Sequence, residues 1–77
     1  MNIKELIHKL SYEQDLDVRR YIPDKLAKIG DSRAINPLGK ILVDSKQSAI
    51  MRNEAAESLG KIGDSTANDY LISVLND

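Results

Sequence analysis

The sequence contains no cysteine, tryptophan or phenylalanine, and only three tyrosines supply aromatic rings among its 77 residues. Without cysteine, disulfides, thiolate metal sites and cysteine nucleophiles are excluded. So few aromatic side chains offer little on which nucleic-acid bases could stack. The charges nearly cancel, with 11 Lys and Arg against 12 Asp and Glu, for a formal net charge of -1. We therefore expect neither a nucleic-acid nor a membrane partner, since both are bound through an excess of positive charge.

Long apolar runs are also missing. Lys4, Glu5, His8 and Lys9 interrupt the first ten residues, so they do not resemble a signal peptide. No stretch reaches the roughly 18 apolar residues of a membrane span. A content of 42% hydrophobic and 30% charged residues is that of a folded, soluble domain. We expect a single cytoplasmic domain over residues 1–77.

An internal repeat is the strongest signal in the chain. When residues 18–44 are aligned with residues 51–77, an offset of 33, eleven of the 27 pairs are identical. The pentapeptide Lys-Ile-Gly-Asp-Ser occurs intact at residues 28–32 and again at 61–65. Part of a third unit precedes them, because Leu6 and Leu10 match Leu38 and Leu42 when one loop residue is deleted.

Apolar residues recur at helical spacing in every unit. In the first full unit they are Val18, Ile22, Leu26 and Ile29, a stripe along one face of a helix with 3.6 residues per turn. The second unit repeats the stripe at Met51, Ala55, Leu59 and Ile62. Within these stripes Leu26 and Leu59 are predicted to be core residues. The pattern predicts an all-α fold with five helices, near residues 2–10, 17–29, 33–43, 49–62 and 66–75.

The residues between the helices predict how they are joined. Gly30 and Gly63 follow the last apolar residue of a stripe, where a left-handed cap favours glycine. Asp31 and Asp64 come next and can cap the following helix, so the joined helices should be antiparallel. Asp15 or Asp17 should cap the helix that begins near Val18, a better account of this pair than a calcium loop. Pro23 and Pro37 fall inside predicted helices, and each predicts a kink.

The repeated unit resembles a known family. Val18-Arg19-Arg20 through Gly30-Asp31, and Met51-Arg52 through Gly63-Asp64, are similar to HEAT-like repeats of the phycobilisome-lyase type. The resemblance implies an α-solenoid of about 2.5 helical-hairpin repeats: a partial repeat at 1–16 and repeats at 17–48 and 49–77. It implies a non-catalytic module or scaffold for protein–protein interaction, with no cofactor. The alternatives are a small lyase or chaperone-like subunit acting on a chromophore or protein substrate, or a fragment of a longer HEAT-repeat protein.

Five polar residues form the predicted binding site. The resemblance implies that the helices carrying Val-Arg line the concave face of the solenoid. Their helical phase turns several side chains away from the apolar stripes, and Tyr21 lies at the border. The predicted binding residues are Arg20, Tyr21, Asp24, Asn53 and Glu57. An ordinary solvated helix face is the competing interpretation.

Other candidate sites have weaker support. Iron-binding members of the superfamily carry His-Glu pairs just after Val-Arg, but the matching positions here are Arg20-Tyr21 and Asn53-Glu54. We expect no metal site and no catalytic residue. His8, the only histidine, is interpreted as a solvated helix residue, since two small helical hairpins suggest no pocket. The resemblance implies that Arg19 and Arg52, like Asp31 and Asp64, form polar ladders between units. Phosphate binding is the alternative for the arginines.

The last predicted helix indicates self-association. Solenoids need polar capping units at their ends, yet residues 66–75 carry four large apolar side chains: Leu71, Ile72, Val74 and Leu75. One neighbouring helix cannot cover all four. The sequence predicts a homodimer, or docking on another chain, through residues 66–75.

Overall fold

The computed structural model of the chain describes residues 2–63 and 71–72. Residues 2–63 form helices joined by short connections, and no strand occurs in the described part of the chain. The fold is therefore all-α, as the stripes predict. The elements are α1 (Ile3–Tyr12), α2 (Leu16–Arg19), α3 (Ile22–Ile29), the 3-10 helix η1 (Ser32–Ala34), α4 (Ile35–Val43) and α5 (Ala49–Ile62).

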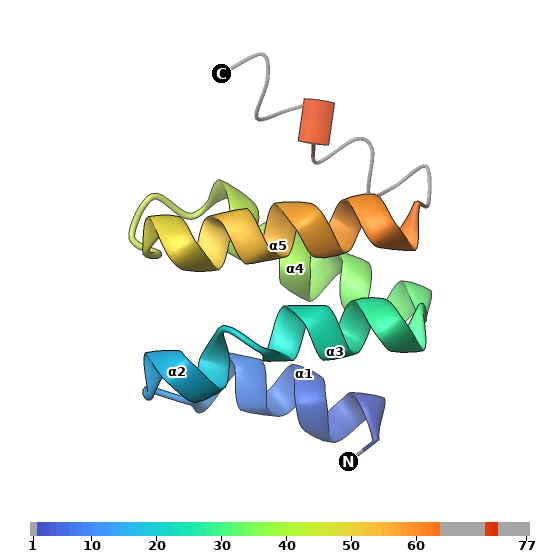
Figure 1. Cartoon of the computed structure of the whole chain (residues 1–77), viewed down its shortest axis with the longest axis horizontal. Coiled ribbons are helices and arrows are strands. Elements are labelled where there is room, and N and C mark those ends of the chain that lie inside the picture. Colours follow the sequence, from blue (N-terminus) through green and yellow to red (C-terminus); the bar gives the residue numbers. More distant parts are fainter. Residues whose placement is uncertain (1, 64–70, 73–77) are drawn as a thin grey trace.

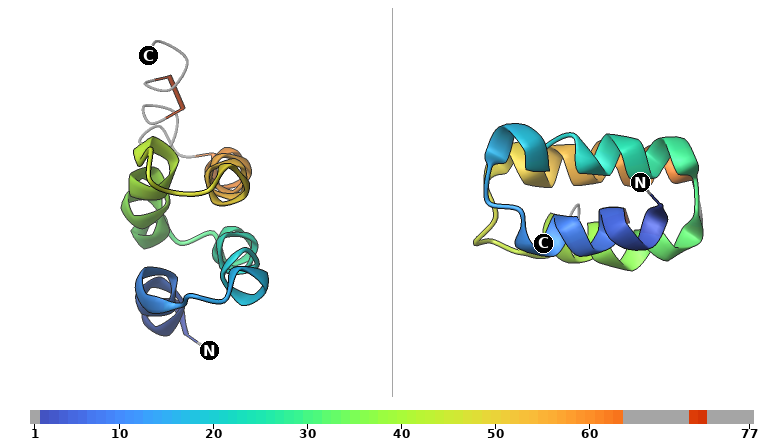
Figure 2. Two further views of the ribbon diagram at one scale, coloured as in Figure 1. Left: turned by 90° about the vertical axis from the view of Figure 1, so that its left-hand side faces the viewer. Right: turned by 90° about the horizontal axis from the view of Figure 1, so that it is seen from below.

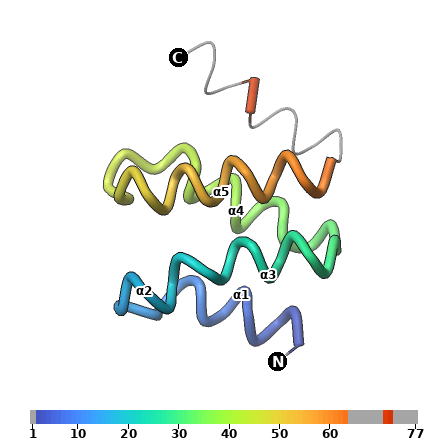
Figure 3. The backbone as a smooth tube through the Cα atoms, in the orientation of Figure 1, coloured from blue at the N-terminus to red at the C-terminus, as the bar shows by residue number. Residues whose placement is uncertain are grey.

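The helices stack in two layers (Figures 1 and 2). One layer contains α1 and α4, and the other contains α2, α3 and α5. Within a layer the helices run parallel, and the chain reverses each time it crosses between layers, as the tube view in Figure 3 shows. The most extensive packing joins α4 to α5, α3 to α5 and α1 to α3. The antiparallel connections expected from the Gly-Asp turns are confirmed at residues 30–31.

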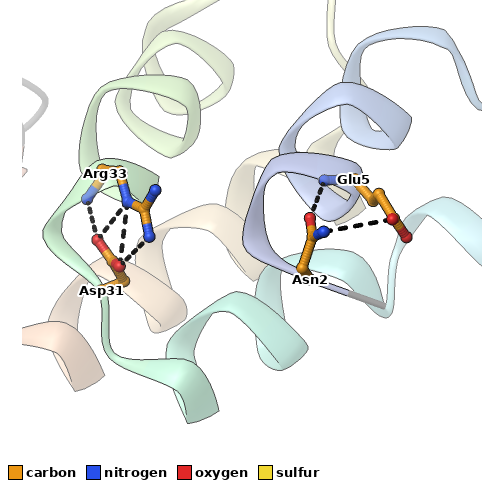
Figure 4. A network of polar contacts seen from close by, with 4 residues as sticks. All are labelled: Asn2, Glu5, Asp31 and Arg33. Atoms are coloured by element: carbon orange, nitrogen blue, oxygen red, sulfur yellow. Dashed lines mark hydrogen bonds and ion pairs between the residues drawn. The ribbon is translucent and has the colours of Figure 1, made fainter.

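Side-chain hydrogen bonds mark the starts of α1, α2 and α5. Asn2 Oδ1 accepts from the amide of Glu5 at 2.9 Å, and the Asn2 amide group donates back to the Glu5 carboxylate at 3.3 Å (Figure 4). Asp15 accepts from the amide of Asp17 at 3.0 Å at the start of α2, and Ser48 caps α5 through the amide of Met51. Such caps satisfy amides that have no partner inside the helix. The capping role predicted for Asp15 is confirmed.

Glycine ends two helices as predicted. Gly30 terminates α3 with φ of 73°, and Gly63 terminates α5 with φ of 68°. Both are left-handed conformations, which a side chain would disfavour. Directly after Gly30, the carboxylate of Asp31 accepts from the amide of Arg33 at 2.9 Å and so caps η1. The predicted cap at Asp64 lies outside the described residues.

The positions of the two prolines in the structure differ from those predicted. The helix predicted over 17–29 is divided into α2 and α3, and Pro23 occupies the first turn of α3. Proline is tolerated there because a first-turn amide has no partner inside the helix. Pro37 is likewise the third residue of α4, since η1 takes up the preceding three residues. The interruption expected near Pro23 therefore occurs as the break at residues 20–21 between α2 and α3. At Pro37 no kink follows, because Pro37 lies in the first turn of α4.

A single apolar core lies between the layers. Leu26, Leu38, Met51 and Leu59 are fully buried, which confirms the two leucines predicted as core. The first predicted stripe is wrong at its ends, because Val18 is 38% and Ile29 is 49% exposed. The division into α2 and α3 breaks the helical phase on which Val18 was assigned, and Ile29 lies in the last turn. Within the described part of the chain, the core cluster consists of Ile3, Leu6, Leu10, Ile22, Leu26, Ala34, Ile35, Leu38, Ile41, Leu42, Met51, Ala55 and Leu59, and Pro23 is also buried.

The predicted helix over 66–75 falls mostly outside the described residues. Leu71 and Ile72 are described and helical. Leu71 packs against the core, whereas Ile72 is 52% exposed. The division of the chain into units at 1–16, 17–48 and 49–77 stays a prediction.

Candidate interaction face on α2, α3 and α5

The five predicted binding residues lie on two neighbouring elements of one layer. Arg20 and Tyr21 occupy the turn between α2 and α3, and Asp24 lies in the first turn of α3. Asn53 and Glu57 lie on α5, which runs parallel to α3 and packs beside it (Figure 1). The repeat offset of 33 therefore places equivalent residues on adjacent parallel helices. We call the surface of these five residues the α3–α5 face.

Asp24 is the best-connected residue of this face. Its Oδ1 accepts from Lys61 Nζ of α5 at 3.1 Å, and its Oδ2 is 3.2 Å from Lys28 Nζ one turn along α3. The hydrogen bond from Lys61, supported by the one from Lys28, holds the pKa of the Asp24 carboxyl below its usual value. The bond from Lys61 also joins the two equivalent helices. Asp24 is therefore a fixed, half-buried carboxylate between two ammonium groups.

Glu57, the equivalent of Asp24 on α5, has a different environment. It is exposed, and no ion pair or hydrogen bond of its carboxylate occurs among the described residues. Lys61, one turn further along, is directed to Asp24 instead. Asn53 is exposed beside it on the same helix. The same repeat position thus holds a paired carboxylate on α3 and, on α5, one without a partner among residues 2–63 and 71–72.

Arg20 and Tyr21 form the other end of the face. The guanidinium carbon of Arg20 lies 5.8 Å from the centre of the Tyr21 ring, within the range of a cation–π contact. Tyr21 is 61% exposed. The break between α2 and α3 places both residues in a turn rather than on a continuous helix. An exposed aromatic ring held beside a cation can contact both apolar and acidic groups of a partner.

Lys28 and Lys61 are residues of this face that the sequence interpretation missed. They are equivalent across the offset of 33, and each follows an acidic residue, Asp24 or Glu57, by four positions. That spacing is the usual one for an ion pair along a helix. The repeated Asp/Glu-to-Lys spacing was the signal that could have found them. Only the stacking of α3 on α5 determines that Lys61 bonds to Asp24 rather than to Glu57.

The repeated arginines differ in their contacts. Arg19 Nε donates to the carbonyl of Leu10 at the end of α1 at 3.0 Å, and its Nη1 donates to Gln47 Oε1 before α5 at 2.8 Å. Arg19 therefore links three parts of the chain, in keeping with the expected polar ladder. Arg52 Nε, by contrast, is buried with no hydrogen-bond partner in the described structure.

Asp31 makes its described contacts within its own turn. Its carboxylate binds the guanidinium of Arg33, two residues away, at 2.7 Å (Figure 4). This contact lowers the pKa of the Asp31 carboxyl and raises that of the Arg33 guanidinium. Asp64, its equivalent, lies outside the described residues, so the ladder expected of Asp31 and Asp64 stays a prediction.

His8 is a solvated residue of α1, as expected. It is exposed, and its ring lies 4.8 Å from that of Tyr12, but it also lines a groove of about 630 Å³ between α1 and α4. The expectation that so small a fold has no pocket is wrong, because side chains of two stacked helices leave this space. The Ser11 hydroxyl donates to the His8 carbonyl at 2.6 Å rather than to its ring.

The described residues contain no group of three or more His, Asp or Glu side chains placed to hold a metal ion. Within the same part of the chain, every helix is too short or too polar to cross a bilayer.

Comparison with known proteins identifies the repeat. No curated protein and no solved structure matches the chain. A family model described as HEAT repeats matches residues 3–77, almost the entire chain. The match agrees with the all-α layers of parallel helices and with the repeat offset of 33. The chain belongs to the HEAT-repeat family.

Proposed function

We propose that this protein is a non-catalytic protein–protein interaction module that binds its partner through the α3–α5 face. HEAT repeats generally mediate protein–protein interaction or scaffolding, and stacked helical repeats offer an extended surface for it. Arg20 and Tyr21 contribute to the face from the turn before α3 and Asp24 from α3, and Asn53 and Glu57 contribute from α5. A cytoplasmic location and the absence of a bound cofactor are part of the same proposal.

The unpaired carboxylate of Glu57 carries the proposal. On α3 the equivalent Asp24 is satisfied by two lysines, so the face already contains an example of the contact that Glu57 lacks. A lysine or arginine of a partner can supply the missing cation. A pairing of this kind gains strength when the partner also excludes water from it.

Tyr21 indicates what surrounds this contact. Aromatic residues and arginine are enriched where protein partners meet, since a large ring buries apolar area at a low cost in side-chain entropy. The face offers one exposed ring, one cation, one free carboxylate and one amide. We therefore propose a partner surface that is polar and mixed in charge, with a basic residue opposite Glu57.

The finer family assignment is also a proposal. The units resemble the phycobilisome-lyase type of HEAT-like repeat in Leu59-Gly60-Lys61-Ile62-Gly63-Asp64. We take this as a likeness in the building unit, with no lyase activity attached. Pigment that co-purifies with the native protein would favour the lyase or chaperone-like alternative.

A partner captured from native cells and identified by mass spectrometry provides the test. The double variant Arg20→Glu with Glu57→Lys should abolish its binding while the protein remains folded. A matched pair of single variants then tests the charge of Glu57 alone. Glu57→Gln should weaken binding at least tenfold, whereas Glu5→Gln on α1 should leave it unchanged. Intact binding by the folded double variant would contradict the proposal.

A further inference from the structure

A second surface lies in the opposite layer from the α3–α5 face. The groove of about 630 Å³ lies between α1 and α4, with Arg19 and Gln47 also in its lining. These two helices belong to one layer (Figure 2), and the α3–α5 face belongs to the other. The groove and the face thus lie mainly in opposite layers, and Arg19 of α2, next to Arg20, is a lining residue from the layer of the face.

The groove has an apolar floor. Ile7 of α1 and Pro37 and Ile41 of α4 contribute to its lining, together with Leu10. Leu10 and Ile41 are buried core residues, and Ile7 and Pro37 are half-buried. The floor is therefore the outer edge of the core, and an apolar side chain placed there would lose contact with water.

The charges that line the groove all have one sign. Lys4 of α1, Lys40 of α4 and Arg19 of α2 are part of the lining. His8 of α1 also contributes to it, and no Asp or Glu does. That segregation is informative in a chain with one more acidic than basic residue. Lys28 and Lys61, by contrast, are both paired with Asp24. Lys4 and Lys40 have no ion pair in the described structure, so they are free to meet carboxylates.

Arg19 gives the groove a fixed donor. Two of its N–H groups are engaged, by the Leu10 carbonyl at 3.0 Å and by Gln47 at 2.8 Å. A guanidinium has five N–H donors in a rigid plane, so further donors remain on a group whose position is already set. A donor held in place loses little conformational entropy when it binds an anion.

We propose that the α1–α4 groove binds an acidic amphipathic helix of a protein partner. Aliphatic side chains of that helix would cover Ile7, Pro37 and Ile41. Its carboxylates would meet Lys4, Lys40 and Arg19. Laying the apolar face of one helix into a groove is a recurrent mode of peptide recognition, and a cleft lined by one sign of charge attracts the opposite sign.

The lining of the groove sets the pattern of that helix. Its apolar stripe would face Ile7, Pro37 and Ile41, and its carboxylates would flank the stripe and reach Lys4, Lys40 and Arg19. A helix with leucine at i, i+3, i+4 and i+7 and with glutamate beside the stripe has this pattern.

The experiment measures binding of a defined probe to the full chain. The probe is a 15-residue fluorescein-labelled peptide, with leucine at helical i, i+3, i+4, i+7 spacing and glutamate elsewhere. Its affinity is read from fluorescence anisotropy at neutral pH. Lys4→Glu with Lys40→Glu should weaken binding at least tenfold. Lys25→Glu with Lys46→Glu makes the same change of charge outside the groove lining and should alter the affinity by less than twofold.

Three further readouts locate the contact. The same peptide with lysine in place of glutamate should not bind. Ile7→Ala, checked for folding by its thermal melt, should weaken binding because it removes part of the floor. Amide chemical shifts of α1 and α4 should change on addition of the probe. Equal losses in the two double-lysine variants, an unchanged affinity of Ile7→Ala, or shifts confined to α3 and α5 would each overturn the proposal. Arg20→Glu with Glu57→Lys should leave probe binding intact, which separates this result from a failure of the proposed function.

Discussion

At the scale of single residues, one repeat position carries two different carboxylates. Asp24 accepts from two lysines, while its equivalent Glu57 has no partner among the described residues. The helical phase read from the sequence predicted that both point away from the core. The spacing of four residues indicates the pair of Asp24 with Lys28. The pair with Lys61 was not predictable, because Lys61 is 37 positions from Asp24 and reaches it only when α3 and α5 stack. Whether a side chain points away from the core is thus predictable from the sequence, whereas its contacts with another helix depend on how the helices pack.

Asp24 gives a pH-dependent prediction. Its folded-state pKa lies below the ordinary value of 3.8, so its ion pairs stabilise the fold above the unfolded-state pKa. That contribution is lost as the pH falls through the folded-state value. Asp24→Asn should therefore melt below the unmodified protein at pH 7, and the difference should shrink below about pH 4. Melting followed by circular dichroism from pH 2.5 to pH 7 measures it, and a difference that stays constant with pH would refute this account.

Leucine and isoleucine at predicted core positions should now behave differently. Leu59 is fully buried and Ile29 is 49% exposed, although the sequence stripes placed both in the core. Leu59→Ala should lower the free energy of unfolding by about 2–5 kcal/mol through lost burial and the cavity left behind. Ile29→Ala should cost less than about 1 kcal/mol, as expected of a surface change. Urea denaturation measures both. Similar losses would mean that Ile29 is buried after all.

At the scale of elements, the helices and their glycine ends were predictable, because spacing and cap chemistry are local. The division into α2 and α3 was not. An apolar spacing of four, four and three residues fits a continuous helix. The spacing alone carries no information on backbone hydrogen bonds, and Pro23 cannot donate one to the carbonyl four residues before it. Pro37 was misplaced for a related reason. The 3-10 helix η1 delays the start of α4, and no apolar pattern distinguishes three residues of 3-10 helix from α-helix.

Two glycines should respond oppositely to alanine. Gly60 lies inside α5, and a Cβ built on it meets nothing within 4 Å, so Gly60→Ala should stabilise the protein by up to about 1 kcal/mol. Gly30 ends α3 with φ of 73°, and Gly30→Ala should destabilise by about 1–2 kcal/mol because alanine is strained there. Urea denaturation midpoints compare the pair. Stabilisation by Gly30→Ala would mean that the left-handed cap is absent.

At the scale of the whole molecule, the repeat offset predicted equivalent helices side by side, and α3 and α5 do pack side by side. The α1–α4 groove was not predictable from that offset. Lys4 and Lys40 come from α1 and α4, whose sequences align only when one loop residue is deleted. That both lysines line one groove is seen only when the two helices are placed in the fold. The same holds for His8. Its neighbours along the chain predict a solvated helix residue, but they do not predict the groove that it lines.

Self-association is the prediction that concerns the molecule as a whole. Ile72 is 52% exposed although Leu71 beside it packs on the core, so this stretch presents apolar surface outward. A homodimer through residues 66–75 would bury that side chain, and its population should rise with protein concentration by mass action. Ile72→Glu should shift the protein to monomer, because a buried unpaired carboxylate is costly.

Ile29→Glu is the matched control for this prediction. Ile29 is similarly exposed, at 49%, but it lies at the end of α3, outside residues 66–75. The same change of size and charge there should leave the oligomeric state unaltered. Light scattering coupled to size exclusion, run over a hundredfold range of concentration, measures the mass of all three proteins. A monomer at every concentration would exclude residues 66–75 as a dimer interface. Equal dissociation by both variants would exclude it too, because Ile72 would then contribute no more to self-association than Ile29 does.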